Sequence, residues 1–160
     1  MPLPSWLQTD SAKTNNQTLF SALLQYLTGT ITSIACSWPM QPLRVLVVDD
    51  DPLVLMGTVD MLMDMGHSVR KALSASDALE KLQEDSDVDV LLTDQTMTGM
   101  TGLELAQLVN AGFPTIAIII ATGHFTLPGF TPALILNKPF TQKQLDEILC
   151  LSLARKNSIS

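Results

Sequence analysis

The fold is decided by a short apolar run that ends in a carboxylate, Val88-Asp89-Val90-Leu91-Leu92-Thr93-Asp94. Its length and composition are typical of a buried strand. Three similar runs are each ended or followed by polar residues: Asp49 with Asp50, Thr122, and Lys138. Because the carboxyl ends of parallel strands meet at one edge of an open α/β sheet, where ligands bind, we expect these groups to lie together.

Helical patterns separate the strands. Asp51-Pro52 is an N-cap followed by proline at the first helical position, and the helix it begins is expected to end near Gly66. Residues 67–73 are more polar, which predicts a strand at the sheet edge. Further amphipathic helices are expected before and after the Asp94 strand and at the C-terminal end. This (βα)5 pattern predicts a doubly wound parallel sheet with helices on both faces.

Composition and charge narrow the function. The length of 160 residues predicts one domain with room for an extra segment. The net charge of −7 argues against a nucleic-acid surface, which needs clustered lysine and arginine. Two cysteines, Cys36 and Cys150, lack the spacing of a metal site or a disulfide framework. Such cysteine usage fits a reducing cytoplasm, where we expect the protein to act.

The first 42 residues differ from the remainder. They contain only Asp10 and Lys13 as charged residues, and residues 14–43 contain none. Residues 19–40 carry many apolar side chains, but glutamine, glycine, serine and threonine interrupt them, so a linker or a partner-binding helix is favoured over membrane insertion. The prolines of Trp38-Pro39-Met40-Gln41-Pro42 indicate a boundary. We therefore expect residues 1–42 to be an N-terminal segment and residues 43–155 to be the domain.

The polar groups at the strand ends fit phosphoryl transfer. Three carboxylates, Asp49, Asp50 and Asp94, are oxygen ligands suited to Mg²⁺, and their mutual repulsion calls for a cation. A carboxylate can also attack phosphorus and form an aspartyl phosphate. Lys138 offers an ammonium and Thr122 a hydroxyl for the charge that develops on the phosphoryl oxygens.

Four motifs in order carry a family resemblance: Val45-Leu-Val-Val-Asp-Asp-Asp-Pro52, Leu92-Thr-Asp-Gln-Thr-Met-Thr-Gly-Met-Thr-Gly102, Ala121-Thr-Gly123 and Asn137-Lys-Pro-Phe140. Through them, residues 43–153 resemble a response-regulator receiver domain of two-component signalling. The resemblance implies a flavodoxin-like strand order 2-1-3-4-5. It also implies a phosphorelay module that receives its phosphoryl group from a histidine kinase or a histidine phosphotransfer protein.

The resemblance assigns roles residue by residue. It makes Asp94 the phospho-acceptor, Thr122 the switch hydroxyl and Lys138 the partner of the phosphoryl group. Asp50 would bind Mg²⁺ directly, Asp49 would assist, and Asp94 and the Thr96 carbonyl would complete the protein ligands. Such a domain is not an enzyme beyond catalysing its own phosphorylation and dephosphorylation.

Three positions depart from the family pattern. Thr98 stands where a proline usually follows the methionine, which alters the turn, and Ile135 stands where an aromatic switch residue is common. Prolines interrupt the short stretch between Thr122 and Lys138, so a reduced fourth helix is expected. This feature resembles receivers of hybrid histidine kinases. A dimer remains open, because that helix belongs to the usual dimerisation face.

Two other functions stay in view. The first is a pseudo-receiver that binds a protein partner without being phosphorylated. The second is a phosphatase of the haloacid-dehalogenase class, because Asp49-Asp50-Asp51 contains an Asp-x-Asp step after a strand. That class needs a later acidic pair at a strand end, whereas Asp146 and Glu147 fall on the predicted last helix.

Overall fold

The computed structural model describes residues 41–123 and 133–157 of the chain. The chain divides into two compact units, Met1–Ser37 and Trp38–Ser160, and the first of these is outside the described residues. Most of the predicted N-terminal segment, and residues 124–132 where the reduced fourth helix is expected, are therefore outside the description as well. Within the described ranges, no helix is both long and apolar enough to cross a membrane.

One parallel sheet organises the domain, and its strand order, β2-β1-β3-β4-β5, confirms the prediction. The more polar strand β2 lies at the edge, as its sequence indicates. The strands are β1 (Arg44–Val48), β2 (Ser68–Ala72), β3 (Val90–Asp94), β4 (Ala117–Thr122) and β5 (Ala133–Asn137).

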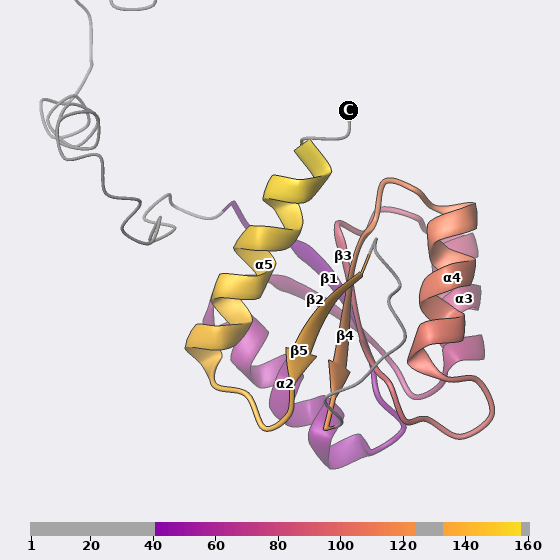
Figure 1. The fold of residues 1–160 in the computed structure, drawn as a ribbon, viewed down its shortest axis with the longest axis horizontal. Coiled ribbons are helices and arrows are strands. Elements are labelled where there is room, and N and C mark those ends of the chain that lie inside the picture. Colours follow the sequence, from indigo (N-terminus) through magenta and orange to yellow (C-terminus); the bar gives the residue numbers. More distant parts are fainter. Residues whose placement is uncertain (1–40, 124–132, 158–160) are drawn as a thin grey trace, which may run out of the picture. The chain divides into compact units, whose positions relative to one another are not determined.

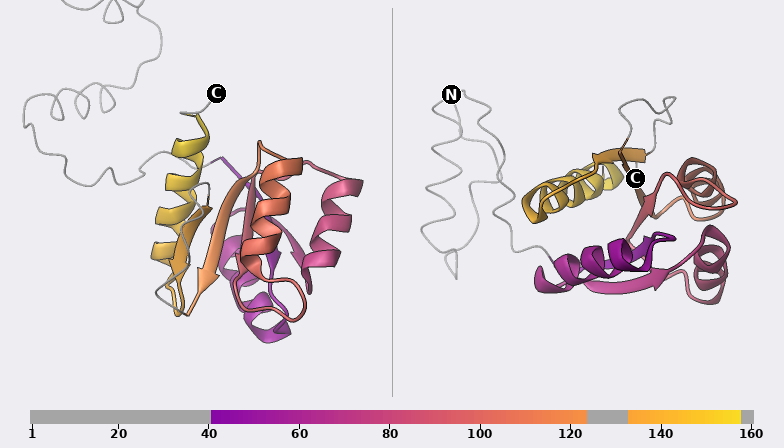
Figure 2. Two further views of the ribbon diagram at one scale, coloured as in Figure 1. Left: turned by 45° about the vertical axis from the view of Figure 1, so that its right-hand side comes forward. Right: turned by 90° about the horizontal axis from the view of Figure 1, so that it is seen from below.

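Helices cover both faces of the sheet, which is the doubly wound arrangement. Those of the described part are α2 (Pro52–Asp64), α3 (Ala75–Glu84), α4 (Gly102–Gly112) and α5 (Gln142–Asn157). Figure 1 and the view from below in Figure 2 show α2 and α5 on one face and α3 and α4 on the other. Each face encloses its own apolar cluster, and β4 serves both: Ile118 and Ile120 belong to one cluster, and Ile119 and Ala121 to the other.

Short polar side chains begin the helices where the sequence predicts. Asp51 accepts hydrogen bonds from the backbone N–H groups of Leu53 and Val54, which confirms it as the N-cap of α2. Thr101 and Glu104 form a reciprocal capping box at the start of α4. Gly66, with φ of +87°, follows the end of α2 in a conformation that favours glycine.

Strands β2 and β3 begin later than their sequence patterns predict, at Ser68 rather than His67 and at Val90 rather than Val88. Just before β3, the Asp89 side chain accepts from the backbone N–H of Arg44 at 3.0 Å and from its guanidinium. Just before β2, His67 is buried, and its Nδ1 accepts from the backbone N–H of Leu43 at 3.3 Å.

Candidate functional site

Four strand ends bring the predicted residues to the same edge of the sheet. Asp49 follows β1, and Asp94 is the last residue of β3. Thr122 ends β4 opposite Asn137, the residue before Lys138. The Lys138 backbone N–H donates to the Thr122 carbonyl at 2.8 Å, which fixes the start of the loop after β5. The convergence predicted from strand ends is therefore present.

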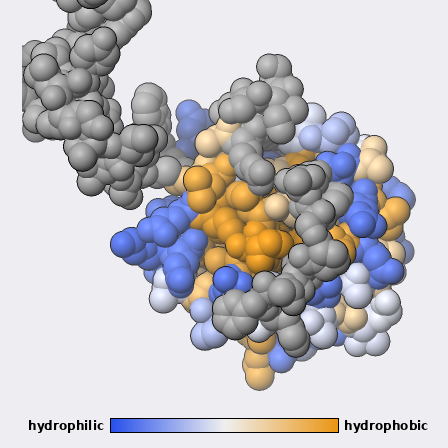
Figure 3. All heavy atoms as spheres, viewed as in Figure 1, coloured by the Kyte–Doolittle hydropathy of each residue, from blue (hydrophilic) through white to orange (hydrophobic). Residues whose placement is uncertain are grey.

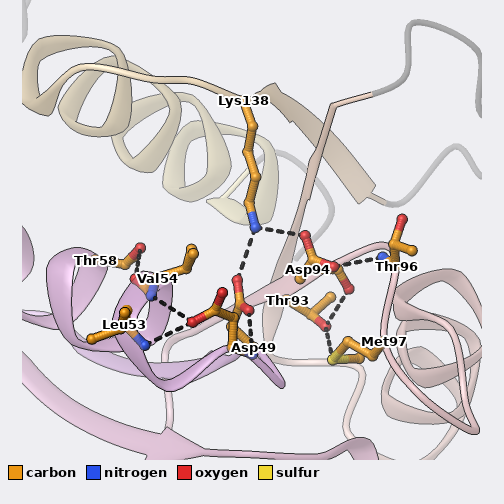
Figure 4. Close-up of polar contacts among 10 residues, drawn as sticks. Asp49, Leu53, Val54, Thr58, Thr93, Asp94, Thr96, Met97 and Lys138 are labelled. Carbon is orange, nitrogen blue, oxygen red and sulfur yellow. Dashed lines mark hydrogen bonds and ion pairs between the residues drawn. The ribbon is translucent and has the colours of Figure 1, made fainter.

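The Lys138 ammonium connects two of these carboxylates. Its Nζ lies 2.8 Å from Asp49 Oδ2 and 2.6 Å from Asp94 Oδ1, and Figure 4 shows it between them. The Lys138, Asp49 and Asp94 side chains are 25%, 9% and 11% exposed, so solvent screens these ion pairs only in part. Burial alone would lower the pKa of Lys138, but the hydrogen bonds and the negative charges of Asp49 and Asp94 together outweigh burial and raise the pKa above its ordinary value. The ammonium therefore stays charged at neutral pH.

Backbone groups orient the Asp94 carboxylate from the other side. Its Oδ2 accepts from the backbone N–H of Thr96 at 2.6 Å. The next residue, Gln95, donates its backbone N–H to the Ala121 carbonyl at 2.8 Å, which ties the loop after β3 to β4. Both Asp94 oxygens thus have a defined donor, one from Lys138 and one from Thr96.

Asp50 points to a different partner. Its Oδ2 accepts from the backbone N–H of Thr98 at 2.8 Å and from the Thr98 hydroxyl at 2.9 Å. The backbone bond, followed by the hydroxyl bond, lowers the pKa of Asp50. Because Asp50 and Thr98 are 48 residues apart, these bonds join the loop after β1 to the loop after β3.

A glycine contact places the loop after β3 against helix α4. A Cβ on Gly102 would come within 2.1 Å of the Asp94 carbonyl oxygen and 3.0 Å of the Gln95 Cα. The Gly102 backbone N–H also donates to the Gln95 carbonyl at 3.1 Å. Only a residue without a side chain allows α4 to begin this close to Asp94.

Sequence comparison decides the family. The profile of the response regulator receiver domain matches residues 45–149, about two-thirds of the chain.

The chain belongs to the response regulator receiver family. Domains of this family are signalling modules of two-component systems rather than metabolic enzymes. The assignment favours the receiver interpretation over the haloacid-dehalogenase alternative.

Similar proteins include receivers in both kinases and transcription regulators. The sensor kinase CckA of Brucella abortus is 34% identical over 108 residues, which are 63% of this chain and 11% of that protein. The transcriptional regulatory protein FixJ of Azorhizobium caulinodans is 31% identical over 116 residues, which are 72% of this chain and 54% of that protein. This chain therefore matches only part of such relatives.

Solved structures agree on the fold. A receiver domain protein from Clostridium thermocellum superposes with a TM-score of 0.68 at 27% identity, and the match covers 74% of this chain and 99% of that one. The receiver domain of the hybrid histidine kinase CckA superposes with a TM-score of 0.61 at 26% identity and covers 69% of this chain and 98% of that one.

The receiver's donor set suits Mg²⁺ in kind, but its carboxylates are bonded to donors of the protein itself. Asp49, Asp50, Asp94 and the Thr96 carbonyl offer the hard oxygen atoms that this cation prefers. Within the described residues, however, no three acidic, histidine or cysteine side chains form a group ready to hold a metal. Lys138 and Thr98 occupy carboxylate oxygens that a cation would use. Binding would therefore require some of these bonds to be exchanged.

The sequence does not predict the contacts of two residues that shape this site, Thr98 and Gly102. Thr98 is expected only to alter a turn, yet it supplies both donors to Asp50. Gly102 ends one of the sequence motifs, but hydrophobic periodicity does not predict that its backbone lies against the Asp94 carbonyl. The signal for Thr98 is its hydroxyl and N–H in place of a proline that has neither.

Proposed function

We propose that this receiver accepts a phosphoryl group on Asp94 in a Mg²⁺-dependent reaction. The donor is a phosphohistidine of a histidine kinase or of a histidine phosphotransfer protein, and the exchange takes place in the cytoplasm. One observation carries the proposal: a charged lysine, Lys138, bridges Asp94 and Asp49 where four parallel strands end. A carboxylate held beside a fixed cation is arranged for attack on phosphorus.

The transfer uses Asp94 as the nucleophile. One of its oxygens forms a bond to phosphorus while the bond from phosphorus to the histidine nitrogen breaks. The electron pair of the broken bond remains on the imidazole, which takes a proton from solvent and leaves neutral. The bonds that Asp94 makes to Lys138 and to the Thr96 N–H set the direction of its oxygens before the attack.

Charge compensation comes from this chain and from the cation. Lys138 keeps its proton, because its pKa is raised, and can transfer its hydrogen bond from Asp94 to an oxygen of the incoming group. Asp49, Asp50, Asp94 and the Thr96 carbonyl would hold Mg²⁺, which would supply positive charge to compensate the phosphoryl oxygens.

A switch follows from the same strand ends. Thr122 is buried at the end of β4, the strand next to Asp94, and its carbonyl holds the residue that carries the ammonium. We assign its hydroxyl to the phosphorylated state, where it would bond a phosphoryl oxygen. Such a bond shifts a two-state equilibrium by favouring one arrangement of the loop after β4.

A protein donor fits the surface beside the site. Leu53, in the first turn of α2 and two residues from Asp51, is 84% exposed. In the same helix, Met56 and Met63 are 43% and 60% exposed. These exposed apolar side chains on α2 support contact with a protein donor rather than with a free metabolite.

Intact mass after incubation with acetyl phosphate and Mg²⁺ tests the proposal. We expect one phosphoryl adduct on the wild type, none on Asp94→Ala, and none with a chelator present. If the folded wild type binds Mg²⁺ yet gains no adduct, the phospho-accepting function is wrong. The pseudo-receiver interpretation, in which the domain only binds a partner, would then take its place.

A further inference from the structure

We propose that Thr98 is a positioning residue that holds the Asp50 carboxylate on the loop after β3 and so weakens the binding of Mg²⁺ by this receiver. The inference rests on the proposed function only in its use of Asp50 as a cation ligand. It concerns a residue outside the set of metal ligands and the phospho-acceptor.

The contact fills one carboxylate oxygen completely. A carboxylate oxygen has two lone-pair sites, and Asp50 Oδ2 accepts two hydrogen bonds, both from Thr98, at 2.8 and 2.9 Å. Hydrogen bonds to a charged oxygen are stronger than those between neutral groups. A cation that takes this oxygen must therefore displace at least one of the two donors.

Asp50 has a different bonding partner from the other two carboxylates of the site. Asp49 and Asp94 share the Lys138 ammonium, whereas Asp50 has its bonds to the loop after β3. In the described part of the chain, the acidic side chains form no group of three suited to a metal. A cation that binds Asp50 through Oδ2 would have to replace a bond from Thr98.

The residue type at position 98 makes this contact possible. A proline there would lack the backbone N–H and the hydroxyl, and an alanine or valine would keep the N–H alone. The next residue, Gly99, has φ of +87°, a conformation that favours glycine and shapes the loop on which Thr98 lies. The hydroxyl is thus the part of the contact that a substitution can remove without changing the backbone donor.

Thr98→Val is the variant that separates the two donors, since valine has nearly the same shape. Losing one charge-assisted hydrogen bond at an exposed site should tighten Mg²⁺ binding by about threefold to tenfold. Thr98→Ser keeps the hydroxyl and should bind as the wild type does. Thr115→Val is the matched control, because Thr115 lies in the exposed turn before β4, at the end of the strands opposite to the site. This variant should bind Mg²⁺ with the same affinity as the wild type.

The experiment is a Mg²⁺ titration of the full chain, followed by the backbone amide signals of Asp50 and Thr96 in NMR spectra at constant ionic strength and without a phosphoryl donor. The inference holds if Thr98→Val binds more tightly and Thr98→Ser does not. Unchanged or weaker binding by Thr98→Val would overturn it, and so would a wild type and variants that all fail to bind Mg²⁺. Failed phosphorylation of proteins that still bind Mg²⁺ would instead count against the proposed function alone.

Discussion

Replacing Gly102 by alanine should damage both the stability and the chemistry of the domain. The added Cβ would lie 2.1 Å from the Asp94 carbonyl oxygen and 2.9 Å from its carbonyl carbon. Cβ atoms essentially never come within 3.0 Å of another heavy atom in this way, so α4 and the loop after β3 must separate by about 0.9 Å. The opposing atoms belong to the backbone and cannot rotate aside.

The size of the effect follows from this displacement. Overpacking of this kind costs about 1–3 kcal/mol, and the better helix propensity of alanine returns up to about 1 kcal/mol. We expect a net loss of about 1–2 kcal/mol in the free energy of unfolding. A misplacement near 1 Å can slow a reaction by about 10²-fold. Because Asp94 itself must move, phosphorylation by acetyl phosphate should slow by roughly tenfold to a hundredfold.

Urea unfolding measures the first effect, and the rate of adduct formation by intact mass measures the second. Gly57→Ala is the matched control, because Gly57 lies inside α2 and a Cβ there would meet nothing within 4 Å. That variant should gain about 1 kcal/mol and keep the wild-type rate. A Gly102→Ala protein as stable and as fast as the wild type would refute the close approach and the reasoning built on it.

Three further predictions concern other contacts. Lys138→Met leaves Asp49 and Asp94 without their ammonium. After a discount for partial exposure, the variant should lose about 1–3 kcal/mol of the free energy of unfolding. In thermal melts, Mg²⁺ should stabilise this variant more than it stabilises the wild type. Burial lowers the pKa of His67 from 6.5, so the folded state binds fewer protons than the unfolded state. The free energy of unfolding should therefore fall as the pH drops below 6.5. In urea unfolding from about pH 8 to about pH 5.5, His67→Gln should show a shallower decline than the wild type. Thr101→Ala removes the capping box of α4 and should cost about 1 kcal/mol by the same measurement, whereas Thr101→Ser should cost little.

The fold was predictable because each element has a local signal that agrees with the whole. Asp51-Pro52 marks a helix start, and the apolar runs that end at Asp94 and Thr122 mark strands buried on both faces. Parallel strands place their ends together, so the convergence on Lys138 follows from topology. The apolar run predicts a strand from Val88, whereas β3 begins at Val90, because apolar content does not mark the first residue of the hydrogen-bonded ladder.

The remaining parts of the site depend on loop conformation, which local patterns do not encode. The bond from Thr98 to Asp50 joins residues far apart in sequence and depends on the path of the loop through Gly99. The contact of Gly102 with Asp94 is set by how closely a helix start approaches a strand end. The polar groups of the site can be identified from the sequence, but which of them form hydrogen bonds depends on the conformation of the loops.

The net charge of the site links Mg²⁺ binding to phosphorylation in the proposed function. Asp49 and Asp94 pair with the Lys138 ammonium, whereas Asp50 is bonded to Thr98. The three carboxylates and one ammonium therefore leave a net charge of about −2 at the site. An aspartyl phosphate carries about two negative charges where Asp94 had one, which raises the excess to about three. A divalent cation therefore interacts more favourably with the phosphorylated site than with the free one. Because binding free energies are linked reciprocally, the factor by which Mg²⁺ favours phosphorylation at equilibrium is also the factor by which phosphorylation tightens Mg²⁺ binding.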